Sequence, residues 1–146
     1  MGIEILPGNE AIVVQLDAIA ARAADLYPAY AGITAGFHKV EAAMFASGGG
    51  SHPWLPLNDR TRPNADPRMI LIDTEALEES LGGNSDTTMG PNFIEWTTPI
   101  PYAQFHDDGM GHNPHRALID ITPATVLLWD IILNNYVLHG FTSTTA

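Results

Sequence analysis

The sequence contains no cysteine and a single lysine, Lys39. Without cysteine, disulfides, zinc–thiolate sites and thiol nucleophiles are excluded, and one lysine on a predicted helix offers little for covalent amine catalysis. Positive charge is scarce as well, because six Lys and Arg stand against seventeen Asp and Glu, giving a formal net charge of −11. Such a field repels phosphate, and the one loose basic cluster, Arg60, Arg62 and Arg68, is interpreted as a solvated loop rather than a nucleic-acid surface.

Several sequence signatures are also missing. There is no glycine-rich phosphate-binding loop, no Gly-x-Ser-x-Gly nucleophile motif and no dinucleotide-binding fingerprint. The amino terminus has neither a basic stretch nor a long apolar run, so we expect no signal peptide and synthesis in the cytoplasm. No repeat or low-complexity tract divides the 146 residues, which predicts a single domain over residues 1–146.

The first third of the chain has the spacing of two helices. Apolar residues recur three or four apart at Ile12, Leu16, Ile19, Ala23 and Leu26, before Pro28 interrupts the pattern. A second stripe follows at Ile33, Phe37, Val40 and Met44, with His38, Lys39 and Glu41 outside it. The glycines at 48–50 predict the end of the second helix.

The middle of the chain predicts a loop, a brief helix and a hairpin. Residues 48–68, rich in Gly, Pro and Arg, indicate a long surface loop anchored by Trp54, Leu55 and Leu57. Asp73 or Thr74 can cap a short helix that carries Leu77 and Leu81. Residues 82–98 read as a hairpin with a turn at 89–92, although its register is not determined. The fold class expected is therefore α+β, with N-terminal helices, a small antiparallel sheet and a C-terminal helix packed as one domain.

The last helix, predicted to begin at the N-cap Thr122 and Pro123, has an unusual composition. Its apolar residues surround almost the whole circumference: Val126, Leu127, Leu128, Trp129, Ile131, Ile132 and Leu133. The stretch spans only about 20 Å of helix, where a bilayer core needs about 30 Å. Two buried faces are the better explanation, one on the subunit's own sheet and one on a second subunit. The alternative is a helix enclosed wholly within its own subunit. The predicted oligomer interface consists of Val126, Trp129, Ile132, Leu133 and Tyr136.

One segment has the residue types of a metal site. His106, Asp107, Asp108, His112 and His115 fall within ten residues, and a metal-dependent hydrolase would need such side chains to converge on one cation that keeps a position for water. The spacing matches no helical ligand pattern. We therefore prefer hydrogen-bonded loop histidines and expect no cofactor, with the hydrolase kept as the alternative.

Three stretches, in this order, resemble the bacteriophage virion-morphogenesis family, which includes Mu G-type tail-completion proteins and related neck proteins of long-tailed phages. The first has Phe45, glycines, Trp54-Leu-Pro-Leu57 and Thr61; the second is residues 70–80, with Leu71, Thr74 and Leu77; the third is residues 101–109, with Tyr102, His106 and Gly109, followed by Pro114 and Arg116. The resemblance covers about residues 37–121. Glu75 departs from it, standing where the family favours glycine.

The resemblance implies a non-enzymatic virion protein that forms a homo-oligomeric ring at the head–tail junction, in a neck, tail-completion or tail-terminator role. Its partners would be neighbouring neck or connector proteins and tail-tube proteins, with DNA only passing through the channel and no membrane contact. The residues named in the three stretches are implied to be structural, His106 included. A third possibility, based on charge alone, is an acidic regulatory module that binds a basic protein.

Overall fold

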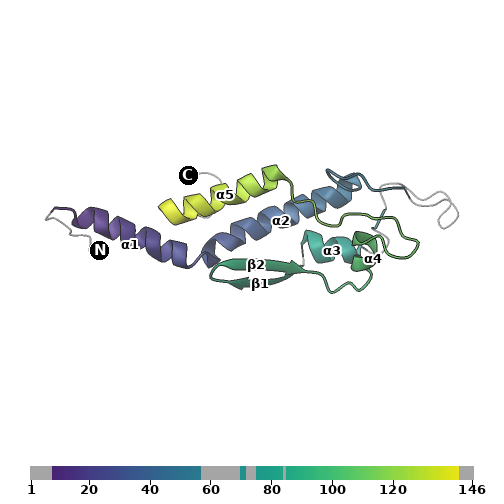
Figure 1. Ribbon diagram of the computed structural model, residues 1–146, viewed down its shortest axis with the longest axis horizontal. Coiled ribbons are helices and arrows are strands. Elements are labelled where there is room, and N and C mark those ends of the chain that lie inside the picture. The colour runs from purple at the N-terminus through teal and green to yellow at the C-terminus, as the bar shows by residue number, and fades with distance from the viewer. Residues whose placement is uncertain (1–7, 57–69, 72–74, 84, 142–146) are drawn as a thin grey trace.

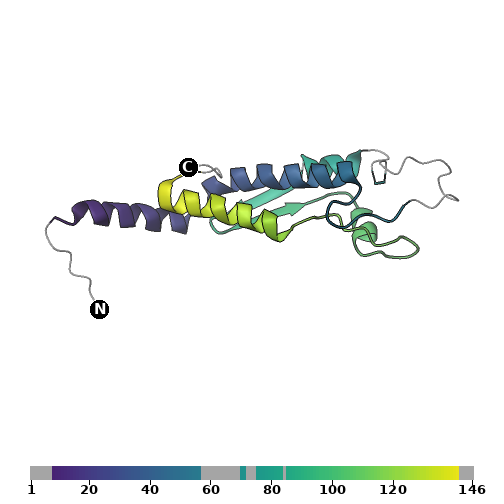
Figure 2. The same ribbon diagram turned by 90° about the horizontal axis from the view of Figure 1, so that it is seen from above.

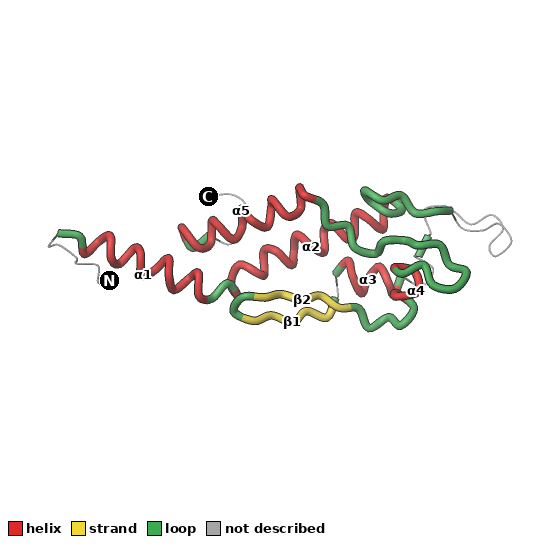
Figure 3. The backbone as a smooth tube through the Cα atoms, viewed as in Figure 1, coloured by secondary structure: helices red, strands yellow, loops and turns green. Residues whose placement is uncertain are grey.

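The computed structural model describes residues 8–56, 70–71, 75–83 and 85–141, and the statements below concern these residues. Their elements, in chain order, are the helices and strands α1 (Glu10–Ala24), α2 (Tyr27–Ser47), α3 (Ala76–Gly82), β1 (Asp86–Gly90), β2 (Phe93–Thr97), α4 (Ala103–Asp107) and α5 (Pro123–His139). Figure 3 shows this mixture of helices and one small sheet. The α+β class, the N-terminal helices, the hairpin and the C-terminal helix are thus confirmed.

The long helix α2 is the centre of the molecule (Figure 1). α5 lies along it and runs back in the opposite direction, while α3 and the hairpin lie below it in this view, and the hairpin contacts α5 as well. α1 continues beyond these elements and projects from one end, as the view in Figure 2 also shows. The molecule is therefore elongated, with α1 at one end and α4 towards the other.

The ends of α2 follow from its sequence. Pro28 occupies the first turn, where its missing N–H costs no helical hydrogen bond. At the other end Gly48 adopts φ 73°, and its N–H donates to the carbonyl oxygens of Met44 and Phe45. A glycine takes this left-handed conformation without strain, so the predicted stop at residues 48–50 is confirmed.

The core face of α2 is wider than the predicted stripe and differs from it at Val40 and Glu41. Buried along it are Ala29, Tyr30, Ile33, Phe37, Glu41, Met44 and Phe45. Glu41, predicted to lie off the stripe, is 0% exposed, whereas Val40 is only half-buried. The residue types alone favoured valine over glutamate for the core, and the packing of the helix decided otherwise.

The hairpin has the predicted turn, and the structure also gives the pairing register of its strands. β1 and β2 pair antiparallel from Asp86 opposite Thr97 to Gly90 opposite Phe93, with a two-residue connection at 91–92. Its inward residues Met89, Ile94 and Trp96 pack on α2 and α5. Trp96 stacks on Phe37 at 4.2 Å between ring centroids.

The core divides into two clusters along α2. One lies towards the end of α2 that α1 joins, and contains Ala29, Tyr30, Ile33, Ile132 and Tyr136. The other lies towards the opposite end, and contains Met44, Phe45, Trp54, Ile70, Leu77, Leu81, Ala103 and Leu118. The first joins α2, α5 and the hairpin, and the second joins α2, α3, α4 and the segments around residues 54, 70 and 118.

Three local predictions need correction or fall outside the described residues. The N-cap of α3 is Glu75, without a side-chain cap, while Asp73 and Thr74 are not described. Of the predicted loop, residues 48–56 lack helix and strand, Trp54 is buried and Leu55 is exposed, so only Trp54 acts as an anchor there. Leu57 and the remainder of the loop to residue 68 lie outside the described residues. The one-turn helix α4 was not predicted.

Within the described part of the chain, no helix has the length and apolar character that a membrane span requires.

Candidate assembly surface

The first turn of α5 is capped as its sequence predicts. The Oγ1 atom of Thr122 accepts a hydrogen bond from the N–H of Thr125 at 3.2 Å, and Pro123 takes the first helical position. At the other end Gly140 adopts φ 82° and donates to the carbonyls of Asn135 and Tyr136. Both ends are therefore defined by local sequence.

One side of α5 belongs to the core of its own subunit. Thr125, Ile132 and Tyr136 are buried, and Trp129 and Leu133 are half-buried. Trp129 lies 5.6 Å from Trp96 between ring centroids. Ile132 and Tyr136 were predicted to contact a second subunit, and this needs correction, because α2 already covers both.

The opposite side of α5 is apolar and uncovered. Leu127 is 60% exposed, and Val126, Leu128 and Leu138 are also exposed. Ile131 is half-buried, and the exposed polar residues among them are Asp130 and Asn134. The helix is thus as apolar towards solvent as towards the core, as its composition predicts. The uncovered side is formed by Val126, Leu127, Leu128, Ile131 and Leu138, of which only Val126 belonged to the predicted interface.

A second apolar surface lies on α1, which contains no buried residue at all. Ile12 and Leu16, four residues apart on one side of the helix, are 55% and 59% exposed. What holds the helix to the body is its last turn, where Arg22 donates from Nε to the carbonyl oxygen of Val137 at 2.8 Å and from Nη2 to that of Leu138 at 2.9 Å. The sequence predicts the helix and its apolar stripe. It does not indicate whether other elements of the subunit cover that stripe.

Four of the twelve residues that carry the family resemblance lie in or against the core cluster around Phe45, and a fifth, Arg116, hydrogen-bonds the chain beside Trp54. Phe45 and Trp54 pack edge to face at 5.3 Å, and Trp54 donates from Nε1 to the carbonyl oxygen of Ala117. Leu77 is buried in the same cluster, with Leu71 against it. The guanidinium of buried Arg116 donates twice to the carbonyl oxygen of Leu55. Residues from all three stretches therefore lie close together, and their contacts stabilise the fold.

The remaining motif residues lie in or near α4, or are not described. Tyr102 faces the His106 ring edge-on at 6.2 Å. Gly109 has φ 64°, and an added Cβ there would press on the backbone of His115. Pro114 is half-buried. Leu57, Thr61 and Thr74 lie outside the described residues.

The histidine-rich segment does not gather into a metal centre. His112 and His115 are exposed, whereas His106 is half-buried in α4 and its Nδ1 has no hydrogen-bond partner. Burial, together with the positive charge of Arg116, lowers the pKa of His106. Across the described residues, which include this whole segment, no three histidine, aspartate or glutamate side chains are placed to hold one ion.

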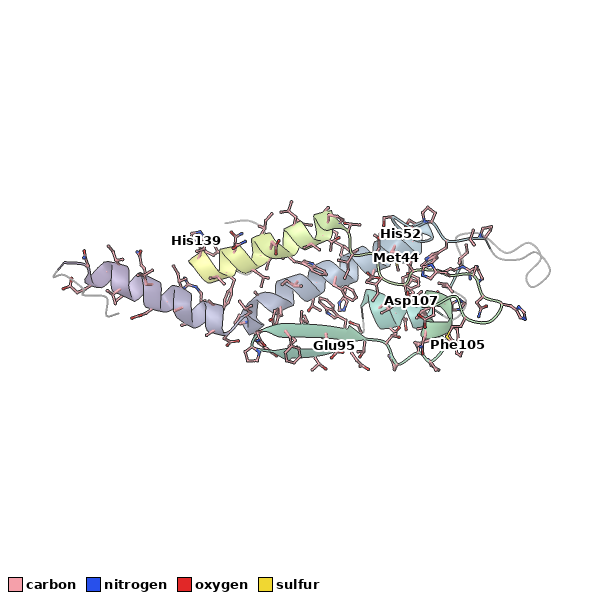
Figure 4. All side chains as sticks on the ribbon, viewed as in Figure 1. Met44, His52, Glu95, Phe105, Asp107 and His139 are labelled. Atoms are coloured by element: carbon pink, nitrogen blue, oxygen red, sulfur yellow. The ribbon has the colours of Figure 1, made fainter. Side chains whose placement is uncertain are left out.

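A polar cluster that the sequence did not predict lies where residues 48–52 meet the segment before α5. Asp120 Oδ2 accepts from the N–H of Ser51 at 2.8 Å, and Oδ1 accepts from the Ser51 hydroxyl. Figure 4 shows His52 beside Met44, near the end of α2. The N–H of Asp120 donates to Oε1 of Glu41, whose Oε2 is buried and has no partner. Glu41, Ser51 and Asp120 are far apart in the sequence and form no recognisable spacing pattern. The sequence alone therefore could not predict the cluster.

The pKa values of the two carboxyl groups in this cluster, Glu41 and Asp120, are shifted in opposite directions. Burial, reinforced by the negative charge of Asp120, raises the pKa of Glu41 to about 7. Burial also opposes the charge on Asp120, but the hydrogen bonds from Ser51 and the nearby His52 outweigh it, so the pKa of Asp120 lies below its usual value. Near neutral pH the fold therefore holds one ionised carboxylate beside one that readily accepts a proton.

Ser51, His52 and Asp120 have the residue types of a hydrolytic triad but not its geometry. In a triad one imidazole nitrogen faces the aspartate and the other takes the serine proton. Here Nδ1 of His52 lies 2.8 Å from the Ser51 hydroxyl and 3.7 Å from Asp120, so both partners share one nitrogen. The Ser51 hydroxyl itself donates to Asp120. This arrangement ties the loop to the segment before α5 and does not activate the hydroxyl.

Comparisons of the chain with models of known protein families, with curated proteins and with solved structures match nothing. The resemblance to the virion-morphogenesis family therefore rests on the three stretches of sequence.

Proposed function

We propose that the chain is a non-enzymatic structural subunit of a tailed-phage virion, which self-assembles into a ring at the head–tail junction. The observation that carries the proposal is the solvent side of α5, where Leu127, Leu128 and Leu138 stay about half exposed or more. Covering one such side chain contributes on the order of 1 kcal/mol. An uncovered apolar side of this kind favours contact with another protein surface.

A ring requires two different complementary patches on each subunit, because head-to-tail contacts close only when unlike surfaces meet. The described residues offer two uncovered apolar surfaces, on the solvent side of α5 and on α1. They are borne by different helices. Each subunit thus has the two different surfaces that a ring of copies requires.

The virion role itself is supported by the motif residues. Phe45, Trp54, Leu71, Leu77 and Arg116 come from separate stretches and converge around one cluster. Glu75, where the family favours glycine, has φ 59°. Glycine is the residue that takes this conformation without strain, so the backbone at this position fits the family pattern even though the side chain does not.

An acidic subunit suits a channel through which DNA passes without binding. The chain carries a formal net charge of −11, and α3 with its N-cap gathers Glu75, Glu78 and Glu79 around a surface pocket. Like charges repel the phosphate backbone. In this proposal DNA is passing cargo, and the protein partners are copies of the chain, neck or connector proteins and tail-tube proteins in the virion.

The alternative of a metal-dependent hydrolase has no geometry in its favour. Its candidate ligands His106, His112, His115 and Asp107 or Asp108 form no three-residue ligand group among the described residues. The Ser51 hydroxyl is held by Asp120 rather than activated. No observation therefore favours hydrolysis over assembly.

Two measurements test the proposal. Light scattering on the purified chain should give a mass several times 15.8 kDa, alone or when a tail or connector is added. Sequencing around the gene should reveal portal, capsid or tail-tube genes beside it. A chain that stays monomeric under all these conditions and hydrolyses esters or phosphates, with no such genes nearby, would overturn the proposal.

A further inference from the structure

The uncovered stripes of α1 and α5 have the same spacing. Along α1 the stripe is Ile12, Leu16, Ile19 and Ala23, at i, i+4, i+7 and i+11. Along α5 it is Leu127, Ile131, Asn134 and Leu138, again at i, i+4, i+7 and i+11. Each spans about 17 Å of helix. Side chains at these intervals form one ridge that fits the groove of a second helix.

The α1 of a subunit reaches only the C-terminal end of the α5 stripe of that same subunit, where Leu138 and half-buried Ile19 line one pocket. The two helices touch only near the C-terminal end of α5, where Arg22 binds the carbonyls of Val137 and Leu138. From there α1 extends away from α5, as both Figure 1 and Figure 2 show. Ile12 and Leu16, in the projecting half, therefore lie far from Leu127, which is near the opposite end of α5.

We propose that the projecting α1 of one copy docks along the solvent side of α5 in the next copy. The inference rests on the self-assembly proposed above and names the two surfaces that meet. Each copy then offers α1 to one neighbour and α5 to the other, which is the head-to-tail arrangement that closes into a ring.

The area of the two stripes fits this occupant. With large aliphatic side chains about half exposed, each stripe presents on the order of 300 Å² of apolar surface. A standard interface takes roughly 800 Å² from each partner, a little more than half of it apolar. One such contact is thus at the low end for a stable dimer. An isolated pair should therefore associate weakly, and a subunit in a ring makes two such contacts, so closure adds stability to each of them.

The lack of charge on the stripes favours an uncharged partner surface, such as the other stripe, over a basic one. The two stripes themselves contain no ionised residue, and the carboxylates of Asp17 and Asp130 lie beside them. A basic partner would find few acidic groups on either stripe, while two uncharged ridges match each other. The contact is expected to be apolar.

The test mixes two full-length variants, each damaged on one surface. Leu16→Asp puts a charge on the α1 stripe, and Leu127→Asp puts one on the α5 stripe. The matched control is Val14→Asp, because Val14 is 67% exposed on the same helix but lies off the stripe. Native mass spectrometry and light scattering then report the mass of each protein alone and of the equimolar mixture.

The expected result is that the unmodified chain and Val14→Asp assemble alike, and that Leu16→Asp and Leu127→Asp are each monomeric. At the high protein concentration that a weak pair requires, their mixture should form a one-to-one dimer of about twice 15.8 kDa, because intact α1 from Leu127→Asp meets intact α5 from Leu16→Asp. Formation of this dimer also shows that both variants are folded.

Other outcomes separate this inference from the function on which it rests. If Leu16→Asp assembles like the unmodified chain, or the mixture gives no dimer, the α1–α5 contact is wrong while self-assembly stands. If the unmodified chain is monomeric at every concentration, self-assembly is wrong and this contact with it.

Discussion

At the scale of single residues, Glu41 is the most deeply buried of the acidic and basic side chains that the structure describes. It is 0% exposed, and burial raises its pKa to about 7. Because the folded-state pKa is above the ordinary value of 4.5, the unfolded chain releases this proton first as pH rises. Its contribution to stability is therefore complete below about pH 4.5 and is lost as pH rises through about 7.

Replacing Glu41 with glutamine tests this directly. The amide resembles the protonated acid, so Glu41→Gln should raise the free energy of unfolding by about 2 to 3 kcal/mol at pH 8 and change it little near pH 5. Urea unfolding at both pH values measures the difference. The lowered pKa of His106 gives an opposite slope, but it acts equally in both proteins and cancels in the comparison.

The matched control is Glu95→Gln, since Glu95 is exposed on β2. It should change stability little at either pH. An equal gain from both substitutions would show that net charge, and not the burial of Glu41, causes the effect.

Glu75 carries backbone strain of a different kind. Its φ of 59° lies in the left-handed region, which costs a residue with a Cβ about 1 to 2 kcal/mol. Glu75→Gly removes this strain but gives the unfolded chain more freedom, so a net gain of about 0.5 to 1 kcal/mol is expected in chemical denaturation. Glu78→Gly, inside α3, should instead lose about 1 kcal/mol. A loss in both variants would contradict the strain at Glu75.

At the scale of elements, one side chain of α1 hydrogen-bonds to the end of α5. Arg22 donates two hydrogen bonds to the last carbonyls of α5, and such bonds from a charged group contribute about 1.5 to 3 kcal/mol. α1 has no buried residue that would replace them. The attachment of α1 to the body therefore depends on Arg22.

Arg22→Ala should loosen α1 and leave the rest of the fold intact. In protein diluted below assembly, amide hydrogen exchange in α1 is expected to accelerate about tenfold or more, while the amides of α2 stay protected. Asp17→Ala, exposed on the same helix, serves as the control. Unchanged exchange in Arg22→Ala would mean that the projecting helix is held by something other than this contact.

At the scale of the whole molecule, assembly must overcome charge repulsion. Each copy carries a formal net charge of −11, so copies repel one another at low ionic strength, whereas the apolar contact does not depend on ions in the same way. Raising the salt concentration from about 50 mM to about 500 mM should therefore strengthen self-association. Sedimentation velocity at a series of concentrations measures it.

The same titration separates assembly from the acidic regulatory module considered from the sequence. Binding of a basic protein to an acidic surface weakens as salt rises. An association that weakens steadily with salt would favour that module and count against apolar assembly.

Local features of the fold could be predicted from the sequence because they depend on neighbouring residues. The N-cap at Thr122, the stop at Gly48, the hairpin turn and the apolar circumference of α5 are all confirmed. Each involves contacts within a few positions. Spacing and residue type therefore suffice for them.

The sequence predicted an uncovered apolar side on α5, but it did not predict which residues form that side. A helix that is apolar all round has no pattern that tells which side meets its own core, so Ile132 and Tyr136 were assigned to the wrong side. The same holds for Glu41, buried where Val40 was expected. Residue type could not reveal either, because neighbours distant in sequence determine which side of a helix is covered.

What the sequence determined by itself is thus the long helices and the hairpin, the stop of α2, both ends of α5 and the excess of apolar surface on α5, all consequences of short-range contacts and composition. Only the tertiary structure decided that α2 covers Ile132 and Tyr136, that Asp120 meets Glu41 and Ser51, and that α1 projects uncovered. The physical reason is that these features depend on which elements pack against one another. Those contacts join residues far apart in the sequence, so a short stretch of the chain does not reveal them.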